Sequence, residues 1–134
     1  MGDIQINSAD FITFVSDALE HYWEIDKLSK HPLSNLNCLT QFLLGDKSKI
    51  SALARGRALQ QLLDYAMGEV RSLDCGHHSA EARYHHVLQK EYVEQIKNEL
   101  AAQQLNMSAS TFYRVRRDAV QCLAQVIADM ERNA

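Results

Sequence analysis

Between residues 108 and 117 the chain gathers side chains that can bind phosphate groups and the edges of bases. The set comprises Ser108, Ser110, Thr111, Tyr113, Arg114, Arg116 and Arg117. An arginine guanidinium can bond O6 and N7 of guanine together, and serine and threonine hydroxyls are frequent phosphate partners. Arg114 and Arg117 are three residues apart, so they share one face of a helix. The opposite face carries Phe112, Val115 and Ala119, and this spacing predicts a helix with a cationic outer face and an apolar inner face.

The residues just before this helix predict how it is held. A short helix over residues 98–105 has a small inner face at Ala101 and Ala102, which would let a following helix cross it closely. Asn106 lies where the chain must turn, and asparagine accepts the left-handed backbone region. Met107 is expected to fill the corner, and Ser108 is a suitable N-cap for the second helix. Two helices joined by a tight turn, the second with outward arginines, are typical of a DNA-binding helix-turn-helix.

This stretch resembles the helix-turn-helix of sigma-factor region 4 and its relatives. The resemblance rests on Leu100-Ala101-Ala102, on Leu105-Asn106-Met107-Ser108 and on Ser110-Thr111-Phe112-Tyr113-Arg114. The upstream matching segments are His31-Pro32-Leu33, RGRALQQLLDYAMGEVRSL and ARYHHVLQKEYVEQ, and they resemble a bacterial helical domain that often precedes STAND-type P-loop ATPases. The likeness runs from about Phe11 to about Ala128, with Asn106 where glycine is common. No ATPase follows here, so we expect a stand-alone version or an excised domain.

The resemblance implies a sequence-reading DNA-binding protein, either a transcriptional regulator or the DNA-binding module of a signalling ATPase system. In that docking mode the N-terminal part of the second helix enters the major groove of double-stranded DNA. The side chains expected to face base edges or phosphates are Ser110, Tyr113, Arg114 and Arg117. Ser108 and Thr111 are expected to cap the helix or contact phosphate. Arg116 points partly aside, so we expect it to meet the DNA backbone.

Apolar residues at helical spacing predict further helices upstream. The first should follow a Ser8 cap. Trp23, Ile25 and Leu28 should either continue this helix or start a short second one, with Trp23 in the core. Pro32 suits the first turn of the next helix. A long helix over 49–73, capped by Ser48, has an inner stripe of Ile50, Leu53, Ala54, Ala58, Leu62, Tyr65, Ala66 and Leu73, widened by Leu59, Leu63 and Val70. A support helix over 80–93 should follow a Ser79 cap.

These elements predict an all-α fold of about six or seven helices in a single domain over residues 1–134. Residues 8–75 should form a helical platform, and residues 79–134 a trihelical helix-turn-helix unit with an extended last helix. The chain has one proline and five glycines, and its Val and Ile residues form no alternating runs, so no strand is expected.

The charge is uneven along the chain. The net charge is −3, which argues against a protein that coats nucleic acid without specificity. Residues 1–83 hold 8 Lys and Arg against 11 Asp and Glu, whereas residues 84–134 hold 6 of each. The acidic N-terminal half supports an alternative function, an adaptor domain that binds a partner protein and uses the helix-turn-helix only as scaffold.

A cluster of Cys75, His77, His78, His85 and His86 raises the question of a metal site. Cysteine and histidine are zinc ligands, but this spacing fits no standard pattern, so we expect a polar loop and neither metal nor cofactor. No nucleophile motif or phosphate-binding loop is present, so we expect no enzyme activity. The odd count of three cysteines and the lack of a signal or membrane-spanning run indicate a cytoplasmic protein with reduced thiols.

The last predicted helix continues past the helix-turn-helix unit with Val126, Ile127 and Met130. Helix-turn-helix proteins commonly bind paired half-sites as dimers. One interpretation is therefore a homodimer through this extension or through the first helix. The alternative is that Val126 and Ile127 pack on the N-terminal platform of the same chain.

Overall fold

A computed structural model describes residues 9–43, 52–72 and 78–133, and every regular element among them is helical. In chain order these are α1 (Ala9–Glu20), α2 (Ile25–Ser29), the 3-10 helices η1 (Pro32–Asn35) and η2 (Asn37–Phe42), α3 (Ala52–Ser72), α4 (His78–Leu88), the π-helical turn η4 (Gln89–Val93), α5 (Asn98–Gln104) and α6 (Ala109–Arg132). The predicted all-α fold is confirmed.

Among the N-terminal elements, α2, η1 and η2 pack on α3, whereas α1 packs mainly on α6 and η1. In α1 the residues Phe11, Val15, Ala18 and Leu19 recur at helical spacing, and all four are buried. The short α2 lies along α3, and η1 and η2 cover the same helix from the following segment. Pro32 begins η1, as expected from its fixed φ and missing N–H.

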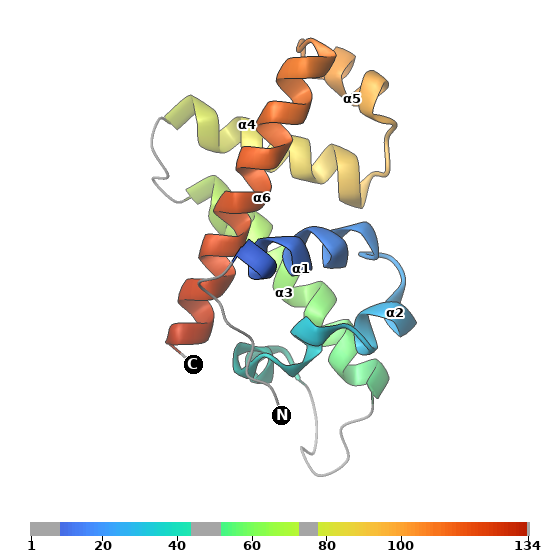
Figure 1. Cartoon of the computed structure of the whole chain (residues 1–134), viewed down its shortest axis with the longest axis vertical. Coiled ribbons are helices and arrows are strands. Elements are labelled where there is room, and N and C mark those ends of the chain that lie inside the picture. Colours follow the sequence, from blue (N-terminus) through green and yellow to red (C-terminus); the bar gives the residue numbers. More distant parts are fainter. Residues whose placement is uncertain (1–8, 44–51, 73–77, 134) are drawn as a thin grey trace.

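The long helix α6 connects the two ends of the molecule (Figure 1). Its first half packs on α4 and α5 at one end, and its second half packs on α1, α3 and η2 at the other. The main core takes Leu123, Val126 and Ile127 from this second half. These residues therefore pack on the platform of the same chain, and the apolar side chains of Val126 and Ile127 are not exposed for a dimer contact.

A smaller apolar cluster holds the other end together. It joins Val87 of α4, Ala101 and Ala102 of α5, and Phe112 and Val115 of α6. We refer to α4 with η4, α5 and the first half of α6 as the three-helix unit. Its core is local, whereas the second half of α6 is shared with the platform.

The support helix differs from its predicted limits. It begins at His78, so Ser79 lies inside the first turn and is not its N-cap. The expected end at Val93 is reached, but through the π-helical turn η4, where the backbone bonds from Glu94 to Gln89 and from Ile96 to Lys90 replace the α pattern. The chain then leaves through Gln95, whose φ is 56°. A helix start that is predicted from a single polar residue can differ from the observed start by one or two positions.

Several predicted core residues are exposed instead. The sequence predicts Leu53 and Tyr65 on the inner stripe of α3, yet each is about half exposed, because the buried face of this helix centres on Leu59, Leu62, Leu63 and Ala66. Trp23 is 54% exposed and contacts the three-helix unit through its ring nitrogen, which donates to the carbonyl of Val93 at 2.8 Å. The predicted Ser8 and Ser48 caps, Ile50 and Leu73 lie outside the described residues, and so do residues 49–51 of the long helix.

None of the helices in the described part of the chain is long and apolar enough to cross a membrane.

Candidate nucleic-acid interface

The turn between α5 and α6 has the backbone geometry expected from its residue types. Asn106 adopts a φ of 58°, and the N–H of Met107 bonds back to the carbonyl of Ala102 at 2.8 Å. Ala101 and Ala102 are buried, so α6 can approach α5 closely. Met107 packs against the small apolar cluster. The turn therefore fixes where α6 starts.

The first turn of α6 is capped by Ser108. Its Oγ accepts a hydrogen bond from the backbone N–H of Thr111 at 3.2 Å, which confirms the predicted N-cap. The Ser108 hydroxyl also donates to Oγ1 of Thr111 at 2.9 Å. Both hydroxyls thus lie at the start of α6 and take part in its capping.

The outer face of α6 carries the predicted polar side chains. The exposed residues on it are Ser110, Tyr113, Arg114 and Arg117. Within residues 9–43, 52–72 and 78–133, Arg114 has no ion-pair partner, and Arg117 reaches only Asp118, with Nε and Oδ1 3.9 Å apart. An exposed pair at that distance is weak. The two guanidinium groups are therefore available to an anionic partner.

Arg116, which we predicted to point partly aside and to meet the DNA backbone, pairs with an acidic side chain of the protein itself. Its Nη1 donates to Oε1 of Glu91 at 3.1 Å, and its guanidinium lies 5.0 Å from the ring centroid of Tyr113. The side chain is only 30% exposed. The π-helical turn η4 presents Glu91 to α6, and this contact between residues 25 positions apart has no local sequence signal.

An open cleft of about 830 Å³ runs beside this face, between α1, the end of η4 and α6. Tyr113, Arg116 and Arg117 line it from α6, and Asp17 and Glu20 line it from α1. Tyr92 also lines it, and burial raises the pKa of its hydroxyl to about 12, so the group is neutral. Sequence reasoning missed the cleft because its walls are about 100 residues apart in the chain.

The predicted polar loop with histidines is only partly described. Cys75, His77 and the side chain of His78 lie outside the described residues. His85 donates through Nδ1 to the carbonyl of Met67 at 3.0 Å, since a carbonyl oxygen can only accept. No cluster of three potential metal ligands occurs among the residues that the structure describes. Cys38 is a buried thiol whose pKa burial raises to about 12.

The chain is similar to one protein family over part of its length. A family model described as "Protein of unknown function (DUF1492)" matches residues 73–124. This is less than half of the chain, and it spans α4, η4, α5 and α6 as far as Ala124. No curated protein and no solved structure matches the chain. The matched residues thus include the three-helix unit.

Proposed function

We propose that the chain is a DNA-binding helix-turn-helix protein, a transcriptional regulator or the DNA-binding module of a signalling ATPase system. In this proposal α5 and α6 are the two helices of the motif, and the N-terminal half of α6 enters the major groove. The observation that carries the proposal is the pair of available guanidinium groups, Arg114 and Arg117, on the outer face of a helix whose inner face is fixed by Phe112 and Val115.

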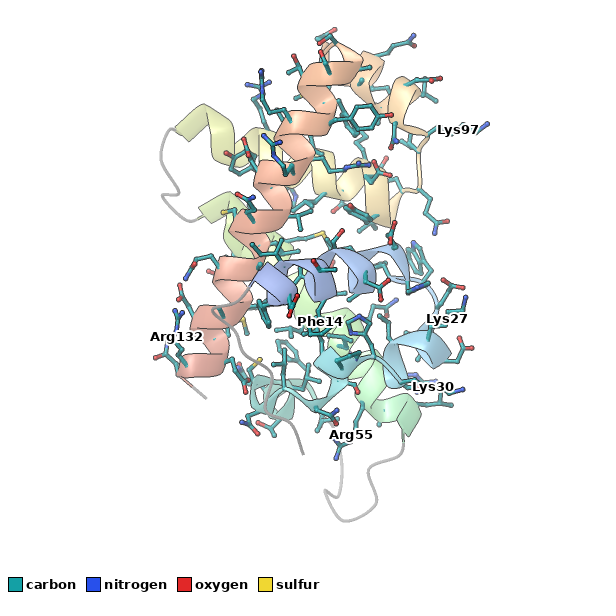
Figure 2. The ribbon with its side chains drawn as sticks, in the orientation of Figure 1. Phe14, Lys27, Lys30, Arg55, Lys97 and Arg132 are labelled. Carbon is teal, nitrogen blue, oxygen red and sulfur yellow. The ribbon has the colours of Figure 1, made fainter. Side chains whose placement is uncertain are left out.

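The few cations near the start of α6 support a binding surface that contacts only a few DNA phosphates. Lys97, in the linker before α5, points away from the body of the protein (Figure 2) and lines the same cleft as Tyr113 and Arg117. The carboxylates of Asp17 and Glu20 on the neighbouring wall would repel phosphates. Lys97, Arg114 and Arg117 are therefore the expected phosphate and base contacts. Because each neutralised phosphate adds about 0.9 to the slope of log affinity against log salt, we expect a slope of about −2 to −3.

Rigid presentation distinguishes a base-reading helix from a flexible basic segment. The inner face of α6 is buried in the small apolar cluster, its first turn is capped by Ser108, and its second half is anchored in the main core. A rigid helix holds its arginine side chains at fixed positions relative to the base edges of the groove, and bidentate pairing with guanine requires such fixed positions. This supports sequence-specific reading rather than coating.

The test is a salt titration of binding to genomic fragments that the parent protein retains. The Arg114→Ala, Arg117→Ala double variant is compared with Arg55→Ala, Arg57→Ala, which removes the same charge from exposed positions on α3 (Arg55 is labelled in Figure 2). A base-reading arginine should cost about 1–3 kcal/mol, and a phosphate-contacting one should reduce the salt slope by about one. The control should bind like the parent. Equal affinity of both double variants, with normal folding, would overturn the proposal.

The second candidate function is an adaptor domain that binds a partner protein. The observation in its favour is that α1 exposes three carboxylates, Asp10, Asp17 and Glu20. An adaptor should show no salt-dependent binding to duplex DNA. A parent protein that binds no duplex at low salt would favour this function.

A further inference from the structure

One carboxylate links all three helices of the three-helix unit. Glu91 in η4 bonds Nη1 of Arg116 in α6 at 3.1 Å. The amide nitrogen of Asn98, the first residue of α5, donates to Oε2 of the same carboxylate at 2.9 Å, and its amide oxygen accepts from the Tyr113 hydroxyl at 3.3 Å. The amide takes this orientation because a carboxylate can only accept. Tyr113, which lies on the outer face of α6, is thus tied to Glu91 through two partners.

The ion pair removes one cation from the outer face. The Glu91 side chain is 18% exposed, and the Arg116 guanidinium also stacks on the ring of Tyr113. A guanidinium that is already paired with a carboxylate releases no counterion when a phosphate approaches, so it adds nothing to non-specific affinity. Without the Glu91 carboxylate, the Arg116 guanidinium would remain beside Tyr113, which is exposed on the outer face of α6, and it could reach a DNA phosphate.

We propose that Glu91 is a specificity-determining positioning residue of the DNA-reading surface. It withholds Arg116 from the phosphates and fixes the position of Tyr113, so that non-specific binding stays low and the helix reads through Arg114 and Arg117. This inference rests on the proposed function. Glu91 lies in the π-helical turn η4, and such turns occur frequently at functional sites.

The first experiment replaces Glu91 in the full chain by glutamine, which keeps the shape and removes the charge. Binding to a retained genomic fragment and to a scrambled duplex of equal length is measured over a range of salt concentrations. We expect Glu91→Gln to steepen the salt slope by about 0.9, the value for one added phosphate contact, and to lower the ratio of specific to non-specific affinity. Addition of Arg116→Gln to the same chain should cancel the steeper slope.

The matched control is Glu94→Gln. Glu94 lies one turn further on, at the end of η4, where it pairs with Lys90 at 3.5 Å, so the change in net charge is the same. This variant should keep the specificity ratio of the parent. An equal loss of specificity in both variants would show a general charge effect and overturn the proposal for Glu91.

The single variant Arg116→Gln tests the same inference if Glu91→Gln does not fold. Because Arg116 is withheld from DNA in the parent, this variant should leave the salt slope unchanged. A slope reduced by about one would mean that Arg116 contacts a phosphate, and the inference would be wrong while DNA binding stands. A parent that binds no duplex would instead overturn the proposed function and this inference together.

Discussion

The carboxylate of Glu131, near the end of α6, accepts a hydrogen bond from the backbone N–H of Cys38 at 2.9 Å, across 93 positions of the chain. Its other oxygen accepts from the backbone N–H and the side-chain amide of Asn37, each at 3.1 Å. The backbone N–H groups of Asn37 and Cys38 lie at the start of η2, where a helix has no internal acceptor for them. A side chain distant in sequence therefore caps this helix.

Replacement of Glu131 by alanine should lower the free energy of unfolding by about 1–2 kcal/mol, because two backbone donors lose their acceptor. The control is Asp129→Ala, which removes a carboxylate from the same exposed end of α6, where it pairs with Arg132. Urea unfolding followed by circular dichroism measures both. Equal stability of the two variants would contradict the cap.

The two described glycines of α3 should respond in opposite directions to alanine. A Cβ on Gly56 would lie 2.5 Å from the carbonyl oxygen of Ile25 and 3.0 Å from the backbone nitrogen of Ser29, so α2 would have to move. A Cβ on Gly68 meets nothing within 4 Å. Gly68→Ala should therefore raise the free energy of unfolding by about 0.5–1 kcal/mol through helix propensity, whereas Gly56→Ala should lower the melting temperature. A stabilised Gly56→Ala protein would show that the contact between α2 and α3 is looser than described.

The pH dependence of stability should include a contribution from His31. Burial is the largest cause of a pKa below the ordinary value of 6.5, and Asp17, whose carboxylate lies 3.0 Å from Nε2, opposes it. Because the pKa of His31 is lower in the folded protein than in the unfolded chain, the unfolded chain binds more protons as the pH falls, and stability rises with pH in this window. The contribution is complete above about pH 6.5 and is lost as the pH falls through the folded pKa.

His31→Asn should flatten that part of the curve. Asparagine keeps an acceptor for the N–H of Leu33, which bonds Nδ1 of His31 at 3.1 Å. Melting temperatures are measured from acidic to neutral pH, with His86→Asn on the exposed side of α4 as the control. A His31→Asn curve that parallels the parent would assign the pH dependence to other groups.

The two faces of α6 should contribute differently to the stability of the fold. Phe112 is fully buried in the small apolar cluster, so Phe112→Ala should cost about 3–5 kcal/mol of unfolding free energy. Arg117→Ala changes an exposed residue and should stay within about 0.5 kcal/mol. Thermal unfolding of both variants checks this. A large stability loss from Arg117→Ala would mean that this side chain supports the fold.

Features that depend on neighbouring residues were predictable from the sequence. The spacing of Phe11, Val15 and Ala18 selects one buried face of a helix, and this spacing does not depend on which element covers it. The left-handed turn at Asn106 and the cap at Ser108 follow from backbone chemistry within a few residues. The exposed positions of Arg114 and Arg117 follow in the same way, because Phe112 and Val115 determine which side of α6 is buried.

Features that depend on distant partners were decided only by the tertiary structure. Arg116 pairs with Glu91 because η4 completes a π-helical turn beside α6. Trp23 stays about half exposed, and its ring nitrogen donates to the carbonyl of Val93, which lies 70 positions away in the chain. The same holds for Tyr65, which the period of α3 places near a buried face but which no neighbouring element covers sufficiently. Helical periodicity specifies the direction of a side chain from its own helix axis, whereas its partner and its burial depend on how the helices pack.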